Sequence, residues 1–212
     1  MPAAVLPAAD CALCERLVEF RRENQRSFPD FFNAPVPSFG NPDARLLIVG
    51  MAPGLRGANR TGRPFTGDGA GNSLYPALLA AGLARGQFDL DGDDDLTLID
   101  TRITNAVRCV PPKNKVTGPE IRTCGRFLQS EIASMPKLAL ILGLGLDAHK
   151  AVLAALGERP SHYKFVHGAR HSLGQVTLFN SYHFSRYNTN TGRLTQPMID
   201  RLFVDICAAL AA

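Results

Sequence analysis

The chain has 212 residues, of which 45% are hydrophobic and 20% charged, and its mean hydropathy is close to zero. This composition is typical of a soluble globular protein and excludes a disordered or fibrous chain. The length allows one well-filled core, so we expect a single domain over residues 1–212. The net charge of +4 is too small to identify a nucleic-acid-binding protein by itself.

Membrane segments are not expected. No apolar run approaches the roughly 20 residues that cross a bilayer. Residues 1–10 lack the basic segment followed by an apolar stretch that marks a secretory signal. We therefore expect a cytoplasmic protein with no membrane partner.

Helical and strand patterns alternate along the chain. Some segments repeat apolar residues at helical spacing, whereas others are short apolar or β-branched runs. In chain order the patterns predict a helix over 11–24, a connector over 31–42, a strand over 46–49, a helix over 72–84, a strand within 96–110 that breaks near Asp100, a helix over 118–135, a strand over 138–142, a helix over 145–156, a strand over 175–181 and a helix over 195–210. This alternation predicts a three-layer α/β/α fold with a parallel sheet, in which ligands bind at the carboxyl ends of the strands.

The acidic segment 89–95 (DLDGDDD) resembles a calcium loop only superficially. An EF-hand loop has glycine at its sixth position and glutamate at its twelfth, whereas Gly92 comes too early and no glutamate follows. We interpret this acidic segment as a solvated turn before a strand.

Five cysteines in a cytoplasmic chain argue against a disulfide framework. Cys11 and Cys14 form a C-x2-C pair on the first predicted helix, and Cys109 and Cys124 begin and end a polar loop. The two pairs either converge into one four-thiolate site or are unconnected buried thiols. A four-thiolate site suits zinc or an iron–sulfur cluster, and the spacing does not choose between them. Cys207 lies on the apolar stripe of the last helix and is interpreted as a core residue.

The segment 50–71 (GMAPGLRGANRTGRPFTGDGAG) places many glycines directly after the first strand. Its spacing matches neither G-x-G-x-x-G nor G-x4-G-K-[ST], which argues against a nucleotide-binding loop. A purely structural loop explains the glycines but not the nearby Phe65 and Asp68. We interpret the segment as a pocket wall, in which glycine lets the backbone approach a flat ligand, the ring stacks on that ligand and the carboxylate polarises a water.

Basic residues gather in the same group of loops. If the loops share one rim, these side chains form an edge that faces phosphates; otherwise they are solvated loop charges. The residues are Arg56, Arg60, Arg63, Lys113, Lys115, Arg186 and Arg193.

Three segments resemble the signature regions of family 5, type b, uracil-DNA glycosylases. They are GMAPGLRGANRTGRPFTGD (50–68), ITNAVRCVPPKNK (103–115) and SYHFSRYNTNTGRLT (181–195), and the resemblance covers nearly the whole chain. It implies the glycosylase α/β fold with a central parallel four-stranded sheet. It also implies a monomeric, nucleoid-associated enzyme of base excision repair that acts on uracil in double-stranded DNA. The implied ligands of a structural [4Fe–4S] cluster are Cys11, Cys14, Cys109 and Cys124.

The resemblance also implies roles for individual side chains. Phe65 would stack on the extruded base and Asn105 would hydrogen-bond the edge of that base. Asp68 would act on water or on the developing positive charge, and His183 would face the uracil O2. The implied substrate contacts are Gly50, Ala52, Pro53, Gly54, Phe65, Asn105 and His183. The implied DNA contacts are Arg56, Arg60, Arg63, Lys113, Lys115, Ser185, Arg186, Asn188 and Arg193.

These residue types suit hydrolysis of an N-glycosidic bond. The bond breaks through an oxocarbenium-like sugar and an anionic base, so the site needs a donor near the base oxygen and negative charge near the sugar. His183 and Asp68 have those properties. Each residue also has a plain interpretation, since Asp68 could cap a helix, Asn105 could bond a turn, His183 could end a strand and Phe65 could be core.

The chain departs from the family pattern at three positions. Family 4 relatives carry a glutamate where Met51 stands, and Met51 can do no acid–base work, which makes Asp68 the natural substitute. Type b enzymes often have alanine where Gly54 stands and proline where Phe184 stands. We expect Phe184 to alter the loop that presses on the minor groove, where Phe184 or Tyr187 could wedge into the base stack.

The leading hypothesis is a DNA glycosylase that excises uracil, with hypoxanthine and other deaminated bases in its range. A second hypothesis is a uracil-DNA reader that flips the base but barely cleaves, motivated by the His183–Phe184 pair. A third is an iron–sulfur redox protein that uses the same fold.

Overall fold

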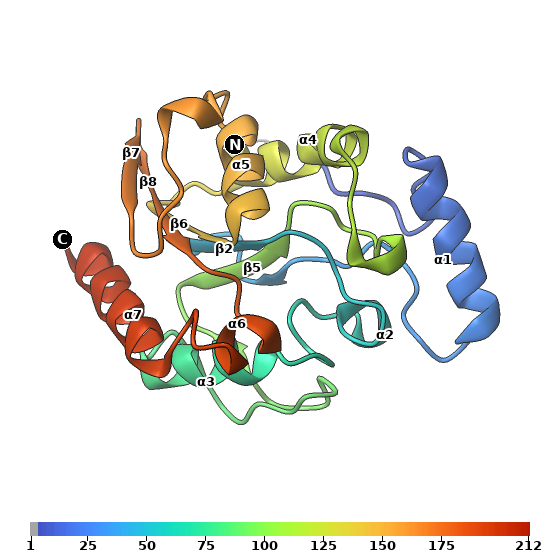
Figure 1. Ribbon diagram of the computed structural model, residues 1–212, viewed down its shortest axis with the longest axis horizontal. Helices are drawn as coiled ribbons and strands as arrows, with labels where there is room; N and C mark the ends of the chain where they lie inside the picture. Colours follow the sequence, from blue (N-terminus) through green and yellow to red (C-terminus); the bar gives the residue numbers. More distant parts are fainter. Residues whose placement is uncertain (1–3) are drawn as a thin grey trace.

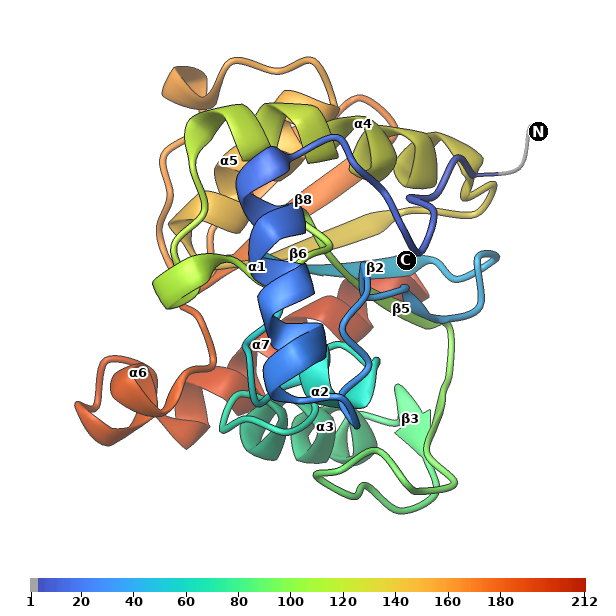
Figure 2. The same ribbon diagram turned by 90° about the vertical axis from the view of Figure 1, so that its right-hand side faces the viewer.

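The computed structural model describes residues 4–212 (Figures 1 and 2). Residues 1–3, with the part of the N-terminal prediction that falls on them, lie outside the described residues. Within residues 4–212 no helix combines the length and the apolar character needed to cross a membrane.

A six-stranded sheet in the order β1-β5-β2-β6-β8-β7 forms the centre of the fold. Its strands are β1 (Phe39–Gly40), β2 (Leu46–Gly50), β5 (Thr101–Asn105), β6 (Leu140–Leu144), β7 (Arg170–Leu173) and β8 (Val176–Ser181). The four inner strands β5, β2, β6 and β8 are parallel, whereas β1 and β7 pair antiparallel at the two edges. A small second sheet pairs β3 (Ala84–Arg85) with β4 (Thr97–Leu98).

The predicted count of four strands is therefore wrong for the sheet as a whole, although four parallel strands do form its interior. β1 has only two residues and lies inside the proline-rich connector 31–42. β7 carries Arg170 and His171 on an edge where polar side chains meet solvent, so it lacks the continuous apolar run of a buried strand. Antiparallel edge strands on a mainly parallel sheet are common. Neither β1 nor β7 has the continuous apolar sequence that predicts an inner strand.

Helices cover both faces of the sheet, as the three-layer prediction requires (Figure 1). One face packs against α4 (Gly118–Ser134) and α5 (Leu146–Ala155), and the other against α3 (Gly71–Ala80) and α7 (Gln196–Ala211). The remaining helices are α1 (Glu15–Ser27), α2 (Ala58–Thr61), α6 (Arg186–Asn190) and the 3-10 turns η1 (Pro112–Asn114) and η2 (Pro160–His162). α1 stands to the right of the sheet in Figure 1 and in front of it in Figure 2, outside both helical layers.

Strand β2 explains why the sheet needs two covering layers. Its residues Leu46, Leu47, Ile48 and Val49 are all fully buried. Leu46 and Ile48 belong to the core cluster that includes α3 and α7, whereas Leu47 and Val49 belong to the cluster that includes α4 and α5. Successive strand side chains point to opposite faces, so a continuous apolar run requires helices on both.

Several predicted boundaries shift. The first helix begins at Glu15 rather than residue 11, so the C-x2-C pair precedes α1 and Cys14 is its N-cap. The helix predicted over 72–84 is α3, which begins at Gly71 and ends at Ala80, and Asn72 lies inside it rather than capping it. The strand predicted over 138–142 begins two residues later as β6. The predicted break near Asp100 is confirmed, since Asp100 has a φ of +49° between β4 and β5.

A buried ion cluster ties α4 to the edge of the sheet. Glu131 of α4 accepts a hydrogen bond from Arg102 Nε at 2.6 Å and from Arg108 Nη2 at 2.5 Å. The Glu131 and Arg108 side chains are each 1% exposed. Arg108 also donates to Ser38 Oγ at 2.7 Å, next to β1. This cluster joins the segment before the sheet, two residues at or just after β5, and the helix that covers them.

Candidate active site

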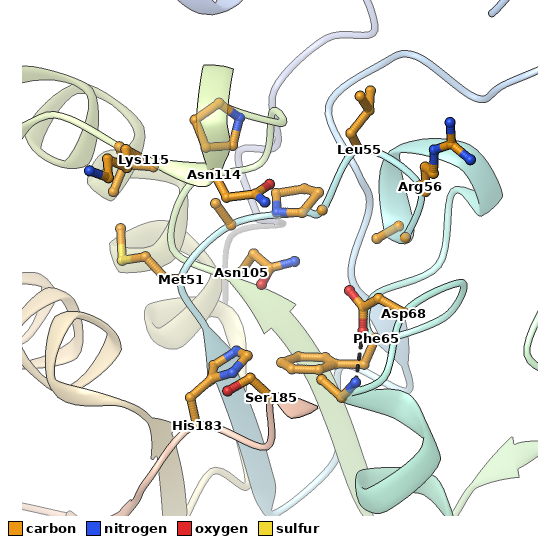
Figure 3. Close-up of a pocket in the computed structure, with 18 of the residues that line it drawn as sticks. Met51, Leu55, Arg56, Phe65, Asp68, Asn105, Asn114, Lys115, His183 and Ser185 are labelled. Atoms are coloured by element: carbon orange, nitrogen blue, oxygen red, sulfur yellow. Dashed lines mark hydrogen bonds between the residues drawn. The ribbon is translucent and has the colours of Figure 1, made fainter. Parts of the chain in front are cut away.

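A cavity of about 850 Å³ opens where the parallel strands end, and we call it the strand-end cavity (Figure 3). Gly50 ends β2 opposite Asn105, which ends β5, and His183 follows two residues after β8. The carboxyl ends of parallel strands meet at one edge of a sheet, which is the place where α/β folds bind ligands. The predicted residues that line the cavity are Ala52, Pro53, Gly54, Arg56, Phe65, Asp68, Asn105, Lys115, His183 and Ser185.

Gly50 lies just behind this lining. A Cβ on Gly50 would stand 2.5 Å from Asn105 Oδ1 and 2.6 Å from Phe65 Cζ, both too close for real atoms. The missing side chain lets the phenyl ring and the amide approach the end of β2 together. Gly50 therefore shapes the site because it has no side chain.

Phe65 forms one wall of the cavity with its ring. The ring is 6% exposed, and its centroid lies 6.2 Å from that of the His183 imidazole at an interplanar angle of 32°. A flat ligand beside both rings would meet one aromatic face and one polar ring edge.

Asp68 enters the cavity from the glycine-rich loop. Its Oδ1 accepts a hydrogen bond from the Ala70 N–H at 3.0 Å, drawn as the dashed line in Figure 3. Its Oδ2 lies beside Gly57, where an added Cβ would be 2.6 Å away. Burial raises the pKa of Asp68 above its ordinary value of 3.8, although the Ala70 and Gly71 N–H groups and His183 act in the opposite direction. Asp68 thus bonds the residue that precedes α3 but does not cap the helix, whose N-cap is Ala70, and the carboxyl lines the cavity.

His183 is held from behind and is largely removed from water. Asn188 Nδ2 donates to the His183 carbonyl oxygen at 2.8 Å. Burial lowers the pKa of His183 below its ordinary value of 6.5, and the charge of Asp68 raises it only in part. The ring is therefore neutral at neutral pH and offers one N–H and one lone pair.

Asn105 is buried, at 4% exposure, yet its side-chain amide has no hydrogen-bond partner among residues 4–212. Within residues 4–212 the amide atoms of Asn105 are not among the fully buried atoms that lack a partner, so they open to the cavity and are available to a ligand there. An amide offers both a donor and an acceptor, which suits the edge of a nucleobase.

The predicted basic rim is only partly assembled. Arg56, Lys115 and Ser185 line the cavity, and the Arg186 side chain packs beside Gly69, next to Asp68. Lys113 lies in η1, two residues before Lys115. Asn188 braces His183, and the Arg193 guanidinium stacks on the Tyr182 ring at 4.7 Å.

Arg60 and Arg63 face the acidic segment instead. Arg60 forms an ion pair with Asp91, and Arg63 forms a two-pronged pair with Asp94. The Asp94 side chain is only 3% exposed. The interpretation of residues 89–95 as a solvated turn is therefore wrong for Asp94, and neither arginine lines the strand-end cavity.

Phe184 is fully buried in the core cluster of α3 and α7, so it cannot wedge into a base stack. Tyr187, in α6, is 72% exposed. The loop that was expected to press on the minor groove contains the short helix α6. The short helix α6 points one aromatic outward while the preceding Phe184 anchors the loop in the core.

Several residues that line the cavity were not predicted individually, although five of them lie in segment 50–71, which was expected to form a pocket wall. They are Met51, Leu55, Gly57, Ala58, Ala70, Pro111, Asn114, Val116 and Asp147. Asn114 lies inside a segment already singled out, and its left-handed φ of +54° follows that of Lys113 at +55°. Asp147 lies in the first turn of α5, three residues after the end of β6, so the rule that ligands bind at strand ends could have found it.

The four cysteines of the predicted metal site converge. Cys11, Cys14, Cys109 and Cys124 are free thiols that line one small cavity of about 20 Å³, which also touches Arg108. The Arg108 N–H lies 3.4 Å from Cys124 Sγ. Across residues 4–212, however, no three His, Cys, Asp or Glu side chains are arranged to hold a metal ion as they stand.

Arg21 places a positive charge beside the four-cysteine cavity. Its side chain is buried, and it donates to Cys109 Sγ at 3.7 Å and to the Cys11 carbonyl oxygen at 3.0 Å. Among the described residues it has no carboxylate within 4 Å. A buried cation requires a compensating anion, which deprotonated thiols would supply. The donor set and this cation fit a four-thiolate metal site.

We expect Gly50→Ala to lower substrate turnover on the order of a hundredfold, because the added methyl group would displace Phe65 and Asn105. Steady-state kinetics at matched protein concentration would measure the effect. Gly125→Ala is the matched control, since a Cβ on this glycine of α4 meets nothing within 4 Å. That control should keep full activity and raise the free energy of unfolding by about 0.5–1 kcal/mol. Equal activity of both variants would contradict the role of Gly50.

Comparison with known proteins gives a consistent family. Residues 37–207 match the model of the uracil DNA glycosylase superfamily. A type-5 uracil-DNA glycosylase of Thermus thermophilus is 48% identical over 194 residues, covering 89% of this chain and 88% of that protein. One of Pyrobaculum aerophilum is 38% identical over 190 residues, covering 88% and 83%. A type-4 uracil-DNA glycosylase of the same organism is 34% identical over 153 residues, covering 70% of each.

The similarity to type-5 enzymes extends over about nine-tenths of the chain and includes the cavity residues, whereas the similarity to the type-4 enzyme is lower and shorter. Together with the parallel sheet and the residues gathered at its carboxyl edge, these matches show that the chain belongs to the uracil DNA glycosylase superfamily and to its type-5 group.

Proposed function

We propose that the protein is a DNA glycosylase that removes uracil from double-stranded DNA by hydrolysing the N-glycosidic bond, leaving an abasic site. Its family supports the reaction class, a hydrolase acting on N-glycosyl bonds. The observation that carries the proposal is the convergence of Phe65, Asp68, Asn105 and His183, from separate segments, on one cavity.

The reaction divides among these four side chains. The base stacks on Phe65, and the free amide of Asn105 hydrogen-bonds its edge. The bond between the sugar C1′ and the base nitrogen breaks with its electron pair leaving on the base. The neutral His183 donates a hydrogen bond to the base oxygen that gains charge. A water oxygen then bonds C1′, and its released proton neutralises the departing base.

Asp68 acts on the sugar side of the cavity. Its carboxylate stabilises the positive charge that develops on the sugar, and it can accept a proton from the attacking water. Met51 lines the same cavity but offers no ionisable group. Among the lining residues, Asp68 and Asp147 are the only carboxylates, and Asp68 is the one whose charge raises the pKa of His183. Asp68 lies next to Phe65 in the cavity (Figure 3).

Double-stranded DNA would have to extrude the base, since a stacked base cannot enter the cavity. Extrusion costs a few kcal/mol, which stacking on Phe65 and the contacts of Asn105 offset. Tyr187 is exposed, and its ring would fill the gap left in the stack. Arg56, Lys115 and Arg186 supply positive charge for the flanking phosphates. A cavity of about 850 Å³ also has room for hypoxanthine and other deaminated bases.

A duplex with a single uracil tests the proposal. After incubation and alkali treatment, strand scission by the wild type that weakens in His183→Ala would support excision. A duplex in which thymine replaces uracil is the control. Binding of the uracil duplex without scission would instead support a reader with little cleavage. The reader hypothesis rested on the His183–Phe184 pair, and it is weakened because Phe184 is buried in the core.

We propose further that Cys11, Cys14, Cys109 and Cys124 hold a [4Fe–4S] cluster, with zinc as the alternative. The support is the shared cavity, the free thiols and the buried Arg21. Bound there, the group would cross-link the segment before α1 to the segments around Cys109 and Cys124, a structural role. Purified protein with a brown colour and broad visible absorbance would identify the cluster, whereas colourless protein containing zinc would identify the alternative.

Cys109→Ser is expected to lower thermal stability more than it lowers the rate of excision, because the loop that follows Cys109 would lose its anchor. Thermal melting and single-turnover excision well below the melting temperature would separate the two effects. Cys207→Ser, in α7 and away from the four-cysteine cavity, is the matched control and should leave metal content unchanged. A Cys109→Ser variant that melts like the wild type would contradict the anchoring role.

A further inference from the structure

Phe65 adopts a backbone conformation that an aromatic residue rarely holds. Its φ is +58°, in the left-handed region where the side chain crowds the backbone. Such a conformation persists only when the surrounding structure holds it, and it recurs at functional sites. The contacts of the residues that flank Phe65 show what holds it here.

Arg63, two residues before Phe65, is fixed by the acidic segment. Its Nη1 and Nη2 donate to Asp94 Oδ1 and Oδ2 at 2.7 and 2.6 Å. The guanidinium also lies over the rings of Phe39 and Tyr75, with its central carbon 5.1 and 5.4 Å from their centroids. The Arg63 and Asp94 side chains are 13% and 3% exposed. This is a buried, two-pronged pair between aromatic rings, a geometry with little freedom to move.

Two further bonds bracket Phe65. Tyr75 Oη donates to the carbonyl oxygen of Pro64 at 2.6 Å, just before Phe65. The N–H of Gly67, between Phe65 and Asp68, donates to the carbonyl oxygen of Leu90 in the acidic segment at 2.6 Å. The acidic segment thus holds the chain on both sides of the ring that lines the strand-end cavity.

Asp94 is held in turn by its own segment. The N–H of Asp89 donates to Asp94 Oδ2 at 2.7 Å, and the N–H of Leu96 donates to Oδ1 at 3.1 Å. With these donors and Arg63, the pKa of Asp94 falls to about 2. The carboxylate therefore stays charged at any pH at which the enzyme would be assayed.

We propose that Asp94, acting through Arg63, is a positioning residue that sets the place of Phe65 in the cavity. Asp94 would then belong to the base-binding machinery although its side chain does not line the cavity. This inference rests on the proposed function, because it assumes that Phe65 stacks on the substrate base.

A double-mutant cycle on uracil excision tests the coupling. Asp94→Asn in the wild type should lower kcat/KM about tenfold to a hundredfold, because a displaced ring binds the base poorly. The same change in a Phe65→Ala background should lower kcat/KM by no more than about twofold, since no ring remains to be positioned. Asp93→Asn, an exposed aspartate with no ion pair in residues 4–212, is the matched control and should keep wild-type kcat/KM.

Tyr75→Phe supplies a milder variant should Asp94→Asn fold poorly. It removes the hydroxyl that bonds Pro64 and should lower kcat/KM less than Asp94→Asn, again only when Phe65 is present. Equal losses of kcat/KM in both backgrounds would overturn the inference, because a general loss of folded protein does not depend on the presence of the Phe65 ring. If Phe65→Ala itself kept full activity, or the wild type excised no uracil, the proposed function would fail instead.

Discussion

Asp68→Asn is expected to lower the single-turnover rate of uracil excision about 10²- to 10⁴-fold, the range typical for loss of a positioned acid–base group. The amide keeps the shape of the side chain and can still accept the Ala70 N–H, so the loop should keep its conformation. It loses the negative charge that faces the sugar and the capacity to take a proton from water. The measurement is excision from a uracil duplex with enzyme in excess, after circular dichroism has confirmed the fold.

Asp93→Asn controls for the change in net charge, because Asp93 is exposed and lies outside the cavity. It should excise uracil at the wild-type rate. A wild-type rate in Asp68→Asn would show that this carboxylate takes no part in the chemistry, and the remaining lining carboxylate, Asp147, would become the candidate.

The pH dependence of excision should also show the ionisation of Asp68. The proposed mechanism requires the charged form of Asp68, whose pKa lies above its ordinary 3.8 because the carboxyl is buried. Excision should therefore fall as the pH drops, beginning at a higher pH than an exposed aspartate would give. The acid limb of the profile should vanish in Asp68→Asn. An unchanged acid limb in that variant would assign it to another group.

Glu131→Gln is expected to lower the free energy of unfolding by about 3–5 kcal/mol, the cost of breaking a buried ion pair by removing one partner. Glutamine keeps the volume of the side chain but removes the charge that balances Arg102 and Arg108. Both guanidinium groups would then lack their carboxylate in the interior. Denaturant unfolding would measure the change, with Glu120→Gln as a comparison.

Glu120 is a suitable comparison because it also forms an arginine pair, with an arginine that stays in contact with water. It accepts from Arg16 Nε and Nη2 at 2.7 Å each, and the Arg16 side chain is 40% exposed. The Glu120 side chain is only 7% exposed, but Arg16 stays hydrated when the carboxylate charge is removed, so the loss of this pair should cost less than that of Glu131. Equal losses would show that burial does not set the strength of these pairs.

The Glu131 cluster also predicts how stability depends on pH. Despite burial, its two arginines lower the pKa of Glu131 below its ordinary 4.5. A carboxyl whose pKa is lower in the folded than in the unfolded state stabilises the fold above the unfolded value, and that contribution is lost as the pH falls through the folded value. The wild type should thus lose stability below about pH 4.5 more steeply than Glu131→Gln.

The inner strands and the covering helices were predictable because their signal is local. Leu46 to Val49 form an unbroken apolar run, which is required of a strand buried on both faces. The edge strand β1 was not predictable, because two residues in a proline-rich connector carry no pattern and pair only through β5. Likewise, Cys11 and Cys14 precede α1 rather than lying on it, since the helix start depends on where the segment packs.

The same distinction between local and long-range signals applies to the candidate site. Phe65, Asp68, Asn105 and His183 could be named from their motifs, and their convergence follows from parallel strands that end at one edge. By itself, therefore, the sequence determined the family, the parallel core and the residues that meet in the cavity.

Only the tertiary structure decided which of the other charged and aromatic side chains face that cavity. Arg63 and Asp94 are 31 residues apart, and no local pattern distinguishes a buried pair from two solvated charges. Phe184 and Tyr187 differ in burial for the same reason, because the packing of α3 and α7 encloses one and leaves the other in solvent. Side-chain burial depends on contacts between distant segments, which exist only after the chain has folded.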